Sequence, residues 1–106
     1  MALTQNFEQV VQARAKTDPA FAKALLDEAT ALFLGGEAET AKQILRALVN
    51  ATVGFEALAE MMHKPSKSLH RMLSGSGNPS MNNLSAIFAA LKSALKVEIR
   101  TRVVSA

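Results

Sequence analysis

Apolar residues recur every three or four positions along most of the chain, and this period predicts amphipathic helices. The first expected helix covers residues 4–16. A second begins at Asp18-Pro19, because Asp caps a helix N-terminus and Pro fits the first turn, and it ends at Gly35-Gly36. In the first helix, Phe7, Val10, Val11 and Arg14 stand at helical spacing, and in the second the expected buried residues are Phe21, Leu25, Ala29, Leu32 and Phe33.

Glycine, proline and serine divide the middle of the chain. Gly54 breaks a helix, Pro65 disfavours helix at the residue before it, and Ser80 is a good N-cap. Further helices are therefore expected over residues 37–51, 55–62, 66–73 and 80–95, with a loop at 74–79. The residues expected to face inward are Ala41, Ile44, Leu45, Leu48, Val49, Phe55, Leu58, Ala59, Met62, Leu69, Met72, Leu73, Leu84, Ile87, Phe88, Leu91 and Leu95.

At the C-terminal end of the sequence, the spacing of apolar residues changes from helical to alternating. Val97, Ile99, Thr101 and Val103 alternate with the charged residues Glu98, Arg100 and Arg102, as in a half-buried strand. A single strand in a helical chain leaves its backbone groups unpaired, so we expect it to pair with a second copy across a two-fold axis or with a different protein. A frayed tail or a continued helix is the alternative. The fold class is thus all-α, about six short helices plus a short C-terminal β-strand.

A chain of 106 residues fits a single domain, here residues 1–106. Within it we expect an N-terminal helical pair (1–36), a helical core (37–95) and a C-terminal strand or tail (96–106). The 49% hydrophobic and 20% charged residues are typical of a globular protein. Without cysteine, thiolate metal sites and disulfides are excluded. No apolar run approaches the roughly 20 residues of a membrane span, and no signal peptide is visible, so a cytoplasmic protein is expected.

Charge is distributed unevenly. Residues 1–40 carry three Lys or Arg against six Asp or Glu, a net charge of −3. Residues 41–106 carry nine against three, a net charge of +6. The basic part suits a polyanion and the acidic part suits a basic protein partner, although solvated faces also differ in charge without a partner.

Two short helices joined by three residues, as expected around His63 to Pro65, form the geometry that directs a helix into the major groove of DNA. Ala59 is the small residue expected where the two helices cross. The candidate DNA-binding residues, which can all bond a base edge or a phosphate, are Lys64, Ser66, Lys67, Ser68, His70 and Arg71. The alternative is that the cations are solubilising charges, Ser66 an N-cap and His70 a surface residue.

The segment FEALAEMMHKPSKSLHRML, followed by SGSGNPSMNNLSAIFAAL, resembles the helix-turn-helix of phage-repressor-type regulators over residues 41–92. The shared features are Leu58-Ala59, the loop ending Pro79-Ser80 and the pattern from Leu84 to Leu91. The chain departs from that family at two turn positions. His63 stands where glycine is usual and is expected to adopt the left-handed conformation, and Lys64 stands where an apolar residue is usual and is expected to reach solvent.

The whole chain resembles the HigA-like antitoxins of bacterial addiction modules, on the motifs ARAKTDPAFAKALLDEA, NATVGFEALAE, PSKSLHRML and GNPS. This resemblance implies a homodimer that binds double-stranded DNA, represses its own operon and binds a small basic toxin. It also implies that Ser66, Lys67, Ser68 and Arg71 lie on the base-contacting side of the recognition helix. Lys64, Pro65 and His70 then lie beside the phosphates.

The expected function is a sequence-specific transcriptional regulator, with a toxin-neutralising interaction module of little DNA affinity as the alternative. An enzyme is not expected. His63 and His70 lack a nearby carboxylate pair for a metal or acid-base site, and the Glu56 and Glu60 pair suits a solvated face. The glycines at 75 and 77 lack the Gly-Lys-Ser/Thr of a phosphate-binding loop. We expect no catalytic residue, metal or cofactor.

Overall fold

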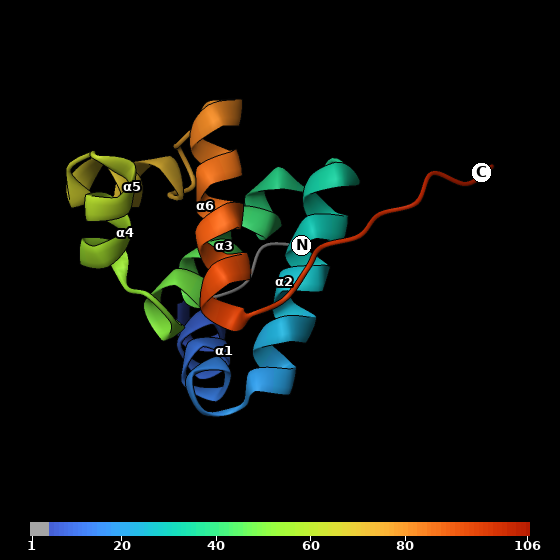
Figure 1. Cartoon of the computed structure of the whole chain (residues 1–106), viewed down its shortest axis with the longest axis horizontal. Helices are drawn as coiled ribbons and strands as arrows, with labels where there is room; N and C mark the ends of the chain where they lie inside the picture. Colours follow the sequence, from blue (N-terminus) through green and yellow to red (C-terminus); the bar gives the residue numbers. More distant parts are fainter. Residues whose placement is uncertain (1–4) are drawn as a thin grey trace.

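Six helices and their connections make up residues 5–106, the part of the chain that the structure, a computed structural model, describes (Figure 1). None of these helices is long and apolar enough to cross a lipid bilayer. The all-α class and the six helices expected from the sequence are confirmed. The helices are α1 (Gln5–Thr17), α2 (Pro19–Leu34), α3 (Ala38–Ala51), α4 (Phe55–Met62), α5 (Ser66–Met72) and α6 (Met81–Leu95).

Local capping chemistry sets the helix boundaries. The Asp18 carboxylate accepts the Phe21 N–H at 3.1 Å, with Pro19 as the first helical residue. The Ser80 hydroxyl accepts the Asn83 N–H at 3.1 Å in the same way. At the end of α2, Gly36 has a φ of +89°, and the following Glu37 N–H returns to the carbonyl of Leu32. These boundaries lie where the sequence predicts them.

Helix α3 is the centre of the fold, packed against α1, α2 and α4. It buries side chains on most of its circumference, and its inward residues are those that the period predicts. The other helices lay one apolar face against it or against each other. The largest fully buried side chains are Leu26, Leu45, Leu48, Val49, Leu58, Leu69, Leu73, Ile87 and Leu91.

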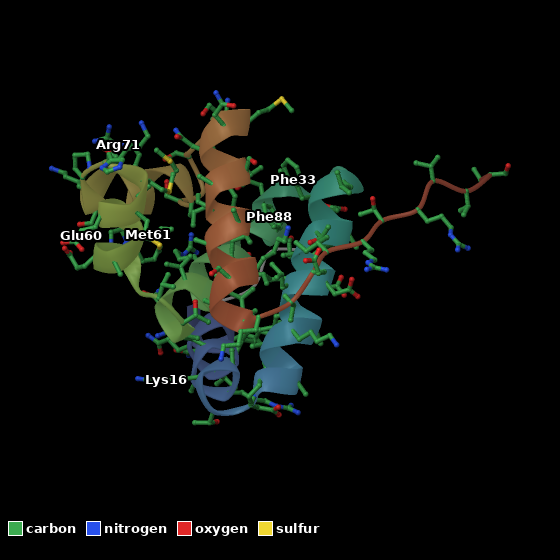
Figure 2. The ribbon with its side chains drawn as sticks, viewed as in Figure 1. Lys16, Phe33, Glu60, Met61, Arg71 and Phe88 are labelled. Atoms are coloured by element: carbon green, nitrogen blue, oxygen red, sulfur yellow. The ribbon has the colours of Figure 1, made fainter. Side chains whose placement is uncertain are left out.

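The buried faces expected for the first two helices are confirmed only in part. In α1, Val11 is buried, but Phe7 and Val10 are 53% and 66% exposed. In α2 the innermost residues are Ala22, Leu26 and Ala29, while Phe21, Leu25 and Leu32 are half-buried and Phe33 is exposed. Small alanine side chains let helices approach closely, so the bulkier rings lie at the margin of the contact. There, Phe33 lies 6.3 Å from Phe88 of α6, centroid to centroid (Figure 2).

The expected C-terminal strand is absent from the described residues. Helix α6 ends at Lys96, whose φ is +56°, and the chain continues extended across α2 and away from the helices (Figure 1). A strand needs a neighbouring strand, and no other extended segment of residues 5–106 pairs with it. The alternation is nevertheless visible in burial: Val97 and Ile99 pack against the core, whereas Glu98 and Arg100 are exposed.

Candidate nucleic-acid interface

Helices α4 and α5 pack against each other and are joined by three residues, His63 to Pro65. His63 adopts the expected left-handed conformation, with φ 54° and ψ 44°. The Lys64 N–H then returns to the carbonyl of Ala59 at 3.1 Å, and the His63 N–H returns to that of Glu60 at 3.3 Å. Pro65, with a φ of −64°, is the N-cap of α5. The chain thus changes direction within three residues.

The inner side of α5 is fixed by apolar contacts. Leu69 and Leu73 are completely buried, and Ala59 of α4 is buried at 7% exposure. On the flank of α5, the imidazole of His70 stacks on the ring of Phe55 with 3.9 Å between centroids and 21° between planes. His70 therefore has a structural contact in addition to the phosphate-neighbouring position implied by the resemblance.

The outer side of α5 exposes Lys67, His70 and Arg71. At about 100° per residue, position 67 lies between positions 70 and 71 around the helix. The side chains of Lys67 and Arg71 make no hydrogen bond or ion pair within residues 5–106, and Arg71 points away from the helical core (Figure 2). Both cations are therefore available to an external anion or base edge.

The remaining sequence-predicted site residues lie at the edges of this face. Ser66 and Ser68 are half-buried on opposite flanks, and Lys64 is exposed in the turn, as expected. The Ser66 hydroxyl donates to the Glu56 carboxylate at 3.2 Å. Glu56 and Glu60 line a shallow hollow beside the turn, together with Lys64 and Ser66. The α4 edge of the face is therefore acidic apart from Lys64, so a phosphate is favoured beside Lys64 or on the opposite edge, towards Arg71.

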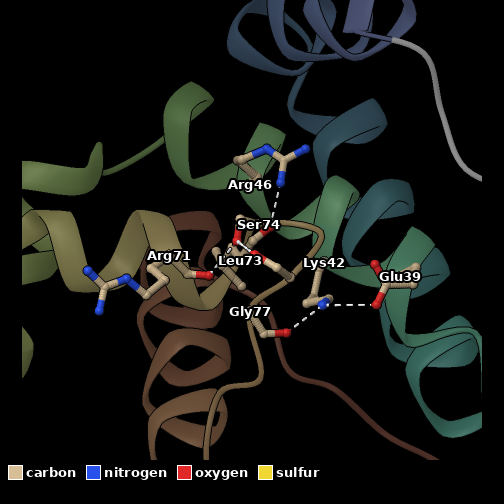
Figure 3. Close-up of polar contacts among 8 residues, drawn as sticks. Glu39, Lys42, Arg46, Arg71, Leu73, Ser74 and Gly77 are labelled. Atoms are coloured by element: carbon tan, nitrogen blue, oxygen red, sulfur yellow. Dashed lines mark hydrogen bonds and ion pairs between the residues drawn. The ribbon is translucent and has the colours of Figure 1, made fainter.

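Two cations of α3 hold the end of α5 from behind, and the sequence interpretation missed both. Arg46 forms a bidentate ion pair with Glu8 of α1, with both N–O distances 2.8 Å, and its third N–H group donates to the carbonyl of Leu73. Lys42 is buried, and its ammonium donates to the Gly77 carbonyl at 2.7 Å and pairs with Glu39 at 3.1 Å (Figure 3). The only sequence signal for the role of Lys42 and Arg46 is their spacing of four residues, which places both beside the buried face of α3.

The loop between α5 and α6 packs tightly on the end of α5. A Cβ atom added at Gly77 would lie 1.9 Å from the Arg71 carbonyl oxygen and 2.6 Å from that of Met72. The Ser74 hydroxyl donates to the same Arg71 carbonyl at 2.7 Å (Figure 3). Glycine is therefore required at position 77 by close approach, and the last turn of α5 is held through its main chain.

The N-terminal end of α6 lies on the same side of the molecule as Arg71 (Figure 2). Met81 and Asn82 are exposed there, directly after the N-cap Ser80. Helix N-termini present free N–H groups and the positive end of the helix dipole. Together with Lys67 and Arg71, this end of α6 makes one face of the molecule favourable to anions.

No three His, Asp or Glu side chains converge as metal ligands would within the described residues 5–106. Comparison of the chain with models of known protein families, with curated proteins and with solved structures finds no match.

Proposed function

We propose that the chain is a sequence-specific DNA-binding regulator, in which α4 and α5 act as a helix-turn-helix and α5 enters the major groove. One observation supports this most directly: Lys67 and Arg71 project, without internal partners, from a helix whose opposite side is fixed by buried Leu69 and Leu73. A helix that is rigid on one side and cationic on the other suits a groove lined with acceptors and phosphates.

The roles of the side chains follow from their chemistry. Arg71 or Lys67 donates to O6 and N7 of a guanine, where a good bidentate pair is worth roughly 1–3 kcal/mol of discrimination against the wrong base. Ser68 adds a weaker contact, and Ser66 does so when its hydroxyl leaves Glu56. Lys64 and the main-chain amides after Ser80 bind phosphates, which fix the position of α5 without selecting a sequence.

The biological role that we propose is a homodimeric repressor acting on a palindromic operator, with recognition helices in successive major grooves about 34 Å apart. The resemblance to HigA-like antitoxins supports the further proposal that this operator controls the chain's own toxin-antitoxin operon.

A second function, neutralisation of a basic toxin, is supported by the acidic surface of the N-terminal third. Asp27 and Glu28 on α2 and Glu37 after it are exposed. Glu39 is also exposed, although it pairs with Lys42. Co-purification from the intact operon tests this proposal: recovery of a basic partner supports it, and recovery of the chain alone contradicts it without affecting DNA binding.

DNA binding is tested first by selecting bound sequences from a random duplex pool at a stated salt concentration. Gel shifts on the selected duplex then compare Lys67→Ala and Arg71→Ala with Lys16→Ala. Lys16 is an exposed cation of α1, far from α5, so it is a matched control (Figure 2). We expect each α5 substitution to weaken binding about tenfold or more, in the range of one base contact, and Lys16→Ala to leave it unchanged. Undiminished, sequence-selective binding by the α5 variants would contradict the proposal.

A further inference from the structure

We propose that residues 97–103 pair with the same residues of a second copy as an antiparallel two-stranded ribbon, with the two-fold axis at Arg100. The ribbon lies over α2 and forms the dimer interface. This inference supplies the contact for the homodimer of the proposed function. It does not depend on DNA recognition, because the residues involved are on a different part of the chain.

The backbone of this segment is available for pairing. The last turn of α6 closes with the Val97 N–H bonded to the Lys92 carbonyl at 3.0 Å. Beyond that bond, residues 98–106 make no main-chain hydrogen bond to any other part of residues 5–106. An extended segment with a free row of N–H and C=O groups is a template for another strand.

The inner face of the segment has room for a second strand. Val97 and Ile99 pack against the core and, with neighbouring residues, border a groove on α2. Further along the chain, Val103 is 99% exposed and Val104 is 70% exposed. In an antiparallel pair, directly opposite residues lie on the same face. A pair centred on Arg100 places Val103 of the second copy opposite Val97, so its side chain enters this groove. The groove is lined by Ala20, Lys23, Ala24, Leu26, Asp27, Val97, Glu98, Ile99 and Arg100.

Charge complementarity selects the second copy as the occupant, and burial of Val103 selects Arg100 as the centre. In this register each Glu98 lies opposite Arg102 of the other copy, and the symmetry makes this ion pair twice. A pair centred on Thr101 would instead place Arg100 opposite Arg102 twice. A pair centred on Ile99 would place Glu98 opposite Arg100 twice, but it would end at Thr101 and leave Val103 in water. A register shifted by one residue would turn the apolar face of the second strand outward.

Arg100 itself lies on the axis, opposite its own copy, and this is the one unfavourable pairing of the register. Glu98 of the other copy is its diagonal neighbour on the same outer face, so the two arginines share two carboxylates. Glu98 and Arg100 are exposed in the single chain, and Arg102 lies in the exposed tail. Substitutions at these positions therefore leave the helical core unchanged.

Charge reversal tests the inference. The variants Glu98→Arg and Arg102→Glu each create two like-charge pairs, and we expect each to weaken dimerisation at least tenfold in analytical ultracentrifugation. The double variant, with both substitutions, restores the pairs and the dimer. Mixing the two single variants, one carrying a mass tag, yields heterodimers in native mass spectrometry. Lys16→Glu, a charge reversal on α1, is the control and is expected to dimerise as the unmodified chain does.

A chain that stays monomeric at millimolar concentration overturns the inference. So do single variants that dimerise like the unmodified chain, or a mixture that forms no heterodimer. Failure here is distinguishable from failure of the DNA proposal. A monomeric variant that still binds one half-site in a manner dependent on Lys67 leaves DNA recognition standing, whereas a normal dimer without DNA affinity leaves the ribbon standing.

Discussion

The guanidinium of Arg46 connects the carboxylate of Glu8 to the main-chain carbonyl of Leu73, which lie 38 and 27 residues away from it in sequence. One side chain of the central helix thereby joins the first helix to the end of α5. Both members of the ion pair are substantially buried, with side-chain exposures of 24% for Arg46 and 14% for Glu8. The position of α5 therefore depends on a residue that lies far from its outer face.

Replacing Arg46 by Met should destabilise the protein strongly. The substitution leaves the Glu8 carboxylate and the Leu73 carbonyl without their donor in a largely buried place, which costs about 3 kcal/mol of unfolding free energy. Urea denaturation followed by circular dichroism measures the change. Arg14→Met is the contrast: Arg14 is exposed, and the loss of its pair with Asp18 and of its contact over the Phe21 ring should together cost only about 1 kcal/mol. Equal effects of the two substitutions would contradict the assigned role of Arg46.

Gly77→Ala should destabilise the protein and weaken DNA binding together. The new methyl group collides with the Arg71 and Met72 carbonyls, so either the loop or the last turn of α5 must move, at a cost of about 1–3 kcal/mol. Gly75→Ala is the matched control. A Cβ atom there meets only the Glu39 carboxylate at 3.9 Å, so its stability should change by under about 0.5 kcal/mol. Thermal melts and gel shifts on the selected duplex give the two readouts.

His63→Gly should raise stability slightly. The left-handed backbone at His63 disfavours any residue with a Cβ, and glycine removes that strain while adding freedom to the unfolded chain. The expected net gain is up to about 1 kcal/mol in urea denaturation. Lys64→Gly, one residue along and without a positive φ, should instead lower stability. A loss of stability in the His63 variant would show that its side chain has a role that the turn geometry does not reveal.

His70 has an observed contact with Phe55 and a proposed contact with DNA, and paired substitutions can separate the two. His70→Ala removes the stack on Phe55, which is worth about 0.5–1.5 kcal/mol, whereas His70→Phe keeps an aromatic ring there. We expect only the Ala variant to lose stability in thermal melts. Both variants should lose the phosphate contact by the same small factor in gel shifts. If the Phe variant bound DNA like the unmodified chain, His70 would have no part in DNA binding.

Much of the fold could be predicted because its signals are local. Asp18 and Ser80 cap helices that begin next to them, and Gly36 ends a helix within two residues. The faces of α1 and α2 could not be predicted in the same way. Whether Phe7 or Ala15 turns inward depends on how closely the helices approach, which is a property of the packed core rather than of either helix.

The candidate site likewise has one part that could be predicted from the sequence and one part that could not. The exposure of Lys67, His70 and Arg71 follows from helical period and could be predicted. The contacts that position them could not. Lys42 and Gly77 are 35 residues apart, and a main-chain carbonyl as acceptor leaves no complementary residue type in the sequence.

Helix α5 is attached through main-chain carbonyls, by Arg46, by Ser74 and by the Gly77 loop. The residues that orient the helix are therefore different from the outward residues that could contact a ligand. The orientation of the helix is independent of the side chains at positions 67 and 71. Under the proposed function, exchanges there alter which base pairs are preferred while the fold keeps its stability. Chains that share this scaffold and the proposed function would then diverge in operator preference through a few outward substitutions, without compensating changes in the core.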